Sequence, residues 1–280
     1  DELLLSIARC RLLGKEKLVS HPLCEYGGPL PLKKEINWES FLKDFMQQFG
    51  PKARIKFHPY IFQTYRDLTP KLSGSDPSIL TFWIEDFSKK SPEDLWGGFR
   101  KTLKQEIKKG EGFVEVGECE NISELRQFYN LYLRTTRKHK NIPLPLSFFD
   151  MFKEHSKIFL AKHEGRVVGG SIFLFYKPFI HYFISASDLR FRDKNIGHQI
   201  LGYVMHKYAG GPYDYFDLGG TRKGSRLEIF KRGWGAKEYP IHEVGGSSKG
   251  SINSALRNIL GLIQSPFMKR FATLALWAKI

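Results

Sequence analysis

The sequence has little cysteine and none of the patterns that mark a metal, redox or nucleotide-loop site. Its 280 residues include only Cys10, Cys24 and Cys119, with no CxxC pair. A disulfide framework or structural zinc is therefore not expected, and a reducing compartment is favoured. The nine histidines form no HxH or HExxH pattern, so no metal site is predicted. Walker and GxGxxG motifs are also absent.

Long apolar runs are missing as well. No stretch of 18 uncharged apolar residues occurs, so a membrane-spanning helix is not expected. Hydrophobic residues make up 41% of the chain and aromatic residues 14%, enough for a packed core.

Residues 254–280 form an apolar, mildly basic tail. Two interpretations stay open for it: docking on an anionic membrane surface, or packing on the preceding domain. We expect a cytoplasmic protein, peripheral at the inner face of the membrane if the tail docks.

Acidic residues are few in relation to basic ones. The chain has 44 Lys and Arg against 29 Asp and Glu, a formal net charge of +15. Such an excess favours an anionic partner, which includes RNA, the phosphates of a nucleotide or coenzyme A, and an acidic membrane surface. The alternative is a basic surface that serves solubility alone.

The order of expected elements indicates two related domains of the α+β (mixed α/β) class, and the length agrees with two domains. In the first half we expect a helix at 37–48, a strand at 53–57, a loop at 66–78, a strand at 79–84 and a helix at 91–109. In the second half we expect strands at 112–116, 157–162, 166–175, 179–186, 213–218 and 236–244, and helices at 122–139, 193–209 and 225–231. The expected boundaries are 1–110, 111–245 and a linker with tail at 246–280.

An ordered series of short segments carries a family resemblance. The series comprises the helix from Glu124 to Arg137, Ile158–Ala161, Val167–Gly170, His181–Ser187, Tyr215–Gly220 and Phe230–Gly235. In this order the chain resembles the FemAB-type and BioF2-like acyltransferases of the GNAT-fold acyl-CoA N-acyltransferase superfamily. The resemblance implies two GNAT-like domains, each a mostly antiparallel sheet flanked by helices, the first incomplete at its start. It also implies transfer of an acyl or aminoacyl group to an amine.

Three residues are candidates for the chemistry. Lys231 follows an Asp-Leu-Gly-Gly segment and precedes Trp234, so its ammonium is suited to an oxyanion or a substrate carboxylate. Asp217, at the expected end of a strand, is suited to orienting or deprotonating an amine. Tyr182 lies mid-strand, where its phenol could serve a leaving group. The structural alternatives are a solvated lysine, a turn-capping aspartate and a packed tyrosine. The resemblance adds substrate-binding candidates: Tyr215, Arg137, Phe230 and Trp234.

A short basic segment is the candidate for holding a donor. Arg192-x-x-Asn195-x-Gly197 stands where relatives have a phosphate-binding loop at a helix start, with one glycine replaced. An ordinary polar helix start is the alternative. The expected donor is acyl-CoA, or aminoacyl-tRNA, although no insertion long enough for a tRNA-contacting arm is present. The expected acceptor is an amine-bearing small molecule, peptide or cell-envelope precursor. A non-catalytic scaffold that binds RNA or membrane is the rival from another class.

Overall fold

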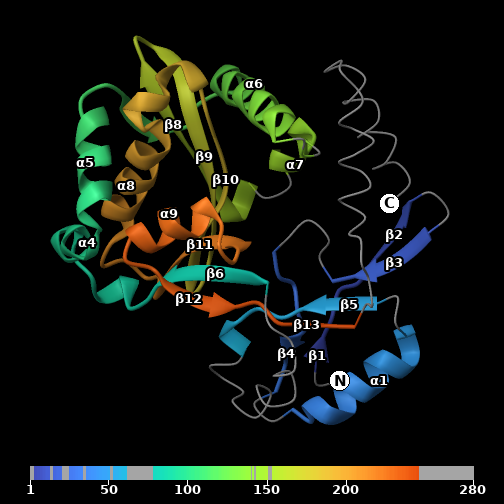
Figure 1. Cartoon of the computed structure of the whole chain (residues 1–280). Helices are drawn as coiled ribbons and strands as arrows, with labels where there is room; N and C mark the ends of the chain where they lie inside the picture. The colour runs from blue at the N-terminus through green and yellow to red at the C-terminus, as the bar shows by residue number, and fades with distance from the viewer. Residues whose placement is uncertain are drawn as a thin grey trace.

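The computed structural model of the chain is drawn in Figure 1. The expected tail at 246–280, and nearly all of the expected loop at 66–78, lie outside the described residues. The structure describes residues 3–12, 15–20, 25–33, 36–50, 53–61, 78–139, 141, 143–150 and 153–245.

A seven-stranded sheet forms the larger part of the molecule, in the order β12-β6-β11-β10-β9-β8-β7. Neighbouring strands are antiparallel except for the pair β10 and β11, which is parallel. The strands are β6 (Ile79–Ile84), β7 (Glu115–Glu118), β8 (Ser156–His163), β9 (Arg166–Tyr176), β10 (Phe179–Ser187), β11 (Tyr215–Arg222) and β12 (Lys237–Pro240).

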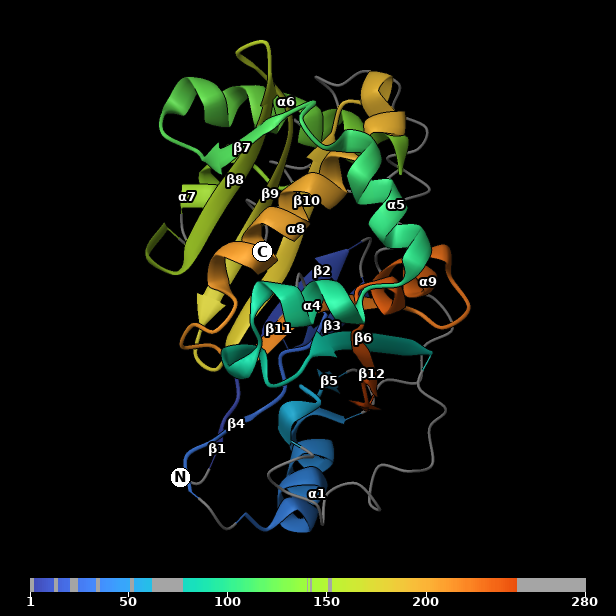
Figure 2. The same cartoon turned by 90° about the vertical axis from the view of Figure 1, so that its left-hand side faces the viewer.

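Helices cover both faces of this sheet. Helices α4, α5 and α8 lie on one face and α6 and α7 on the other (Figures 1 and 2). Two apolar clusters result, one on each face, because the strand side chains alternate between the faces. The helices are α4 (Pro92–Gly98), α5 (Lys101–Gly110), α6 (Ile122–Lys138), α7 (Leu146–Asp150), α8 (Ile196–Tyr208) and α9 (Arg226–Gly233). Short 3-10 helices are η2 (Phe87–Lys89), η3 (Lys153–His155) and η4 (Leu189–Lys194).

Local sequence explains where two of these helices begin. Ser91 caps α4 in a capping box with Asp94, and Pro92 follows in the first turn, where its missing N–H costs no hydrogen bond. Asn121 caps α6 by accepting from the backbone N–H of Glu124.

A smaller sheet has the order β13-β5-β3-β2 and its own apolar cluster, which includes Trp38, Phe45 and Phe57. Helix α1 (Trp38–Phe49) packs there, in the lower part of Figure 1. A separate two-stranded pair joins β1 to β4. The strands are β1 (Leu3–Leu4), β2 (Ala8–Leu12), β3 (Lys15–Val19), β4 (Leu30–Pro31), β5 (Ala53–Lys56) and β13 (Glu243–Val244).

The last strand along the described chain returns to the small sheet. The sequence predicted one strand at 236–244, which was wrong: β12 joins the large sheet and β13 joins the small one. Ile241 and His242 lie between the two strands and are both buried. The apolar pattern continues unbroken where the chain passes from one sheet to the other, so the sequence predicted a single strand.

The large sheet also crosses the expected boundary at residue 110. β6 pairs with both β11 and β12, and α4 and α5 share an apolar cluster with α8. The 110/111 boundary stays a prediction, but residues 79–110 pack with the second half of the chain. The mixed α/β class with mostly antiparallel sheets is confirmed.

The parallel strands β10 and β11 stay together for only three residues. Phe179, Ile180 and His181 pair with Tyr215, Phe216 and Asp217. Beyond that point β10 continues beside β9, while β11 continues beside β6. The two strands separate, and the sheet opens between them.

Candidate functional site

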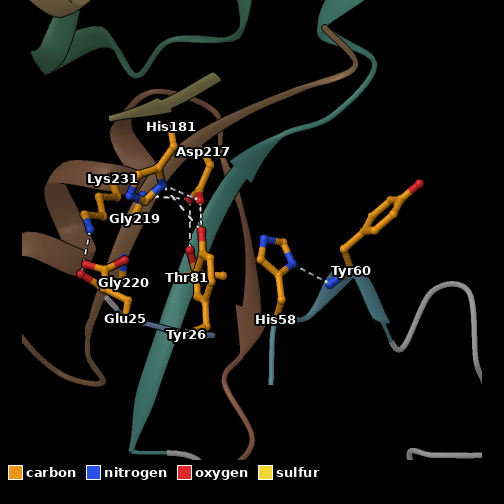
Figure 3. A network of polar contacts seen from close by, with 10 residues as sticks. All are labelled: Glu25, Tyr26, His58, Tyr60, Thr81, His181, Asp217, Gly219, Gly220 and Lys231. Atoms are coloured by element: carbon orange, nitrogen blue, oxygen red, sulfur yellow. Dashed lines mark hydrogen bonds and ion pairs between the residues drawn. The ribbon is translucent and has the colours of Figure 1, made fainter. Parts of the chain in front are cut away.

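Asp217 lies at the point where β10 and β11 separate, and its carboxylate is completely buried. It was expected to end a strand, but it is the third residue of β11. A bulge follows, because the β11·β6 register shifts between Asp217 and Gly220. Four donors converge on the carboxylate: Nδ1 of His181 at 2.7 Å, Oγ1 of Thr81 at 3.0 Å, the backbone N–H of Gly219 at 2.7 Å, and the Tyr26 hydroxyl. Figure 3 shows this cluster.

These contacts fix the charge of the pair. Burial alone would raise the pKa of Asp217, but His181 and the other donors outweigh it and lower that pKa to about 2. For His181, burial lowers the pKa while the Asp217 carboxylate raises it, and the net direction is upward. Tyr26 stays a phenol, since burial and the nearby carboxylate raise its pKa. Asp217 is therefore an anion that holds the Nδ1 proton of His181.

The second ring nitrogen of His181 is left for another partner. Within the described part of the chain, every hydrogen bond recorded for this imidazole uses Nδ1. The side chain keeps 10% of its surface in solvent, whereas that of Asp217 keeps none. An imidazole whose Nδ1–H is held by a carboxylate presents Nε2 as a proton acceptor. The arrangement is that of a general base with its orienting acid.

Lys231 lies beside this pair, on α9, and is only 6% exposed. The sequence left a solvated lysine open as the alternative to a role in the chemistry, and the structure buries this side chain. Its Nζ donates to the carbonyl oxygen of Gly220 at 2.8 Å (Figure 3). Burial lowers the pKa of Lys231, opposed by the negative charges of Glu25 and Asp217. One bond occupies one of the three ammonium hydrogens, so donors remain for a substrate.

Glu25 brings a second carboxylate to the same place from the start of the chain. The Glu25 carboxylate accepts a hydrogen bond from the backbone N–H of Gly220. Lys231 contacts the carbonyl oxygen of the same residue. A Cβ at Gly219 or Gly220 would come within 3.1 Å of the Glu25 side chain, so a larger residue at either position would displace Glu25. Gly219 also has φ +76°, which disfavours other residues.

The segment with Glu25 and Tyr26 ties the two parts of the molecule together. The backbone N–H of Gly27 donates to the carbonyl of Lys56 in the small sheet, while the Tyr26 hydroxyl reaches Asp217 in the large one. The Tyr26 ring meets His58 edge to face, with centroids 4.2 Å apart. The Asp217 cluster is therefore built from both sheets.

His58 lies next to this cluster with a buried, unpaired donor. The backbone N–H of Tyr60 donates to its Nδ1 at 3.1 Å, so Nε2 carries the proton in the neutral ring. Nε2 is buried without a hydrogen-bond partner among the described residues. Burial lowers the pKa of His58 to about 4, so the ring stays neutral at physiological pH. A neutral His58 ring adds no positive charge beside Asp217, so this carboxylate is balanced by its hydrogen-bond donors and by Lys231.

The structure brings together only part of the predicted set. Asp217 and Lys231 meet through the Gly219–Gly220 backbone and mutual electrostatics. Tyr215 precedes them on the same strand, but its ring stacks on Phe179 with centroids 4.7 Å apart. Tyr182 neighbours His181 in sequence, yet it packs against Phe173 in the large apolar cluster.

The aromatic candidates on α9 face the apolar cluster. Phe230 and Trp234 both contact the ring of His198 on α8, and Trp234 is 1% exposed. They position α9, and thereby Lys231, on the sheet. Arg137 is exposed in the last turn of α6.

The candidate phosphate segment does form a helix start. Arg192 is exposed in η4, and Asn195 has φ +51° at the cap of α8. The Asn195 side chain donates to the carbonyl of Glu106 and makes no cap bond to α8. The space beside Gly197 is open, since a Cβ there would meet nothing closer than the Ser185 hydroxyl at 4.0 Å. A helix start without a side-chain cap leaves backbone N–H groups that can receive a phosphate.

Sequence reasoning missed His181, Tyr26, Glu25 and Thr81 as members of the site. His181 stood inside a segment of the family resemblance, but nothing marked it as a base. The signal that identifies it is its register opposite Asp217 on a parallel strand, and that register requires the structure.

Two further features of the described residues bear on the site. No group of three or more His, Cys, Asp or Glu side chains gathers in a way that suits a metal ion. None of the described helices combines the length and apolar character that crossing a bilayer requires.

Comparisons with known proteins agree with this architecture. A family model described as an acetyltransferase (GNAT) domain matches residues 97–239, which is half of the chain. The chain therefore belongs to the GNAT acetyltransferase family. No curated protein matches it.

Solved structures support the fold over most of the chain. The crystal structure of FemX is similar with a TM-score of 0.59 and 15% identity, over 86% of this chain and 87% of that one. L-PGS from Bacillus licheniformis is similar with a TM-score of 0.55 and 13% identity, over 94% and 87%. At these identities the likeness shows the fold alone.

Proposed function

We propose that the chain is an N-acyltransferase that moves an acyl or aminoacyl group from a thioester or ester donor to an amine. Membership of the GNAT family supports acyl transfer in general. The observation that carries the finer proposal is the Asp217–His181 pair beside Lys231, where β10 and β11 separate. A general base, the acid that orients it and a cation therefore lie together where the sheet opens.

His181 acts as the general base in this proposal. Its Nε2 accepts a proton from the amine as the amine nitrogen attacks the donor carbonyl and the new C–N bond forms. The Asp217 carboxylate stays ionised, keeps Nδ1 protonated and stabilises the resulting imidazolium. When the carbon–sulfur or carbon–oxygen bond breaks, the leaving group keeps the electron pair and takes the proton from His181.

Lys231 stabilises the oxygen of the tetrahedral intermediate. That oxygen gains a full negative charge, and a buried ammonium interacts with it more strongly than a solvated one. Glu25 and the Gly220 carbonyl hold the lysine in place. Tyr182 and Tyr215 serve in this proposal by packing the two strands at the reacting centre.

The donor extends from this centre toward the start of α8. Arg192 and the backbone around Asn195 and Gly197 receive its phosphates, as their position at an uncapped helix start allows. Acyl-CoA fits this arrangement. Aminoacyl-tRNA is the alternative donor, and a small molecule, peptide or cell-envelope precursor supplies the amine.

Replacing His181 by Gln tests the assignment through pH dependence. A base works unprotonated, and the pKa of His181 is raised above its usual 6.5. The rate of the natural chain should therefore fall as the pH drops through that raised pKa. His181→Gln should lower turnover by about a hundredfold or more and abolish this acid limb. The measurement is thiol release from acetyl-CoA, or deacylation of aminoacyl-tRNA, against a panel of amines.

His206→Gln is the matched control, because His206 is exposed on α8. It should leave both rate and profile unchanged. If His181→Gln retains its rate and its acid limb, the base lies elsewhere. If the natural chain consumes neither donor with any amine of the panel, a non-catalytic scaffold replaces the enzyme as the explanation of the fold.

A further inference from the structure

A cavity of about 300 Å³ lies at the other end of β10, away from Lys231. α6, the β8–β9 turn and the start of η4 enclose it. From His181 to Asp188, which follows β10, the strand advances seven residues, or roughly 20 Å at about 3.3 Å per residue. The cavity is therefore a second site rather than an extension of the Asp217 cluster.

Three arginines from three different elements line this cavity: Arg134 from α6, Arg166 from the start of β9 and Arg190 from η4. Arg190 is occupied, since its guanidinium grips Asp188 with contacts of 2.6 to 3.1 Å. These bonds lower the pKa of Asp188, and the charge of Arg134 adds to the effect. Asp188 therefore stays ionised, and the Arg190 guanidinium already balances its negative charge.

The remaining charge of the cavity is positive. Arg134 and Arg166 have no hydrogen bond or ion pair recorded within the described residues, and Glu164 in the β8–β9 turn is the one acid left to oppose them. Both guanidiniums are exposed, so an entering ligand reaches them without displacing protein groups. The planar guanidinium groups of Arg134 and Arg166 line the same cavity, and each can donate paired hydrogen bonds to the oxygens of a phosphate.

The remaining wall adds aromatic surface. Phe191 and His163 line the cavity, and His163 stacks on Phe113 with centroids 3.9 Å apart. Nδ1 of His163 donates to the carbonyl of Phe113 at 2.8 Å, which fixes the ring in place. A volume of about 300 Å³ has room for one phosphorylated group.

We propose that this cavity binds the phosphate group of a small ligand, through Arg134 and Arg166. The proposal does not rest on acyl transfer, because the cavity lacks the residues of the proposed chemistry. Two sources supply the same phosphate chemistry: the phosphorylated head of the donor, which would then span the length of β10, or a separate phosphorylated ligand.

The test measures pyrophosphate binding by isothermal titration calorimetry on the full chain, with no donor or acceptor present. Arg134→Gln and Arg166→Gln should each weaken binding by about tenfold, the scale of one charge-assisted contact. Glu164→Gln should strengthen it several-fold, because it removes the opposing charge. Arg126→Gln is the control, since Arg126 is exposed on the same helix but does not line the cavity.

Competition separates the two sources. If coenzyme A displaces pyrophosphate and Arg166→Gln weakens both ligands, the phosphate belongs to the donor. If coenzyme A binds without displacing pyrophosphate, the ligand is a separate one. Absence of pyrophosphate binding, or equal weakening by Arg126→Gln, overturns the proposal. The first outcome would move the donor phosphates from the start of α8 to this cavity, whereas the chemical step is tested separately by the His181 variants at the other end of the strand.

Discussion

The two ends of β10 show what burial does to charged side chains. At His181 the charges are buried, hydrogen-bonded and shifted in pKa, with Asp217 lowered to about 2. At Asp188 the carboxylate is buried as well, but the side chain of the arginine that pairs with it is 77% exposed, so this pair meets solvent. One strand therefore carries a dry polar cluster at its start and a wet one just beyond its end.

This difference determines what each end can do. In a dry cluster a fixed charge acts strongly on a developing charge, which suits a chemical step. In a wet cluster water and salt screen the same charges, which suits reversible binding. Variants at each end of β10 test this difference.

Asp217→Asn should give the largest effect. Four donors point at this carboxylate, and an amide offers one acceptor oxygen and two hydrogens of its own. His181 loses the partner that holds its Nδ1 proton, so turnover should fall roughly a thousandfold or more. Breaking a buried pair should also lower the free energy of unfolding by about 3 kcal/mol or more. Acyl-transfer kinetics and urea denaturation measure the two effects.

Asp214→Asn is the control for this variant. Asp214 is exposed just before the same strand and accepts from the Ser88 hydroxyl at 2.5 Å. It should change turnover less than twofold. Equal losses in the two variants would mean that the buried pair has no special role.

Lys231→Met should rank second. Methionine fills nearly the same space without a charge, so the variant separates electrostatic from packing effects at a residue that is 6% exposed. Loss of one oxyanion donor should lower turnover by about a hundredfold. Arg232→Ala, which removes a half-exposed surface charge, should stay near the natural rate. Natural activity in Lys231→Met, with the fold intact by circular dichroism, would remove the lysine from the mechanism.

Much of the fold could be predicted from the sequence, because its elements are bounded by local signals. Ser91-Pro92 starts a helix through its own hydrogen bonds and fixed φ, and β8 to β10 alternate or run apolar over their full length. The order of these elements came from the same signals, and the resemblance supplied the expected family. The strand at 236–244 failed because its two halves pair in different sheets, a difference that apolar spacing does not record.

The site was harder to predict because long-range register builds it. Lys231 and Asp217 were identified from the segments around them. Tyr26, however, meets Asp217 across 191 residues, and Glu25 meets Gly220 across 195. Phe230 and Trp234 stood beside Lys231 in sequence, yet their rings pack against His198 on α8, whereas the Lys231 ammonium bonds to the Gly220 carbonyl. Proximity along the chain was a poor guide to proximity in the site.

The smallest expected effect is a difference in salt dependence between the two ends. Exposed arginines at the Asp188 end interact with phosphate through water that salt screens, whereas the His181 cluster excludes that water. Raising NaCl from about 50 to about 500 mM should weaken pyrophosphate binding several-fold. The turnover number at saturating donor and acceptor should change less than twofold. Calorimetry and steady-state kinetics in the same buffers give both values, and a turnover number that falls in parallel with binding would show that the two ends share one solvated environment.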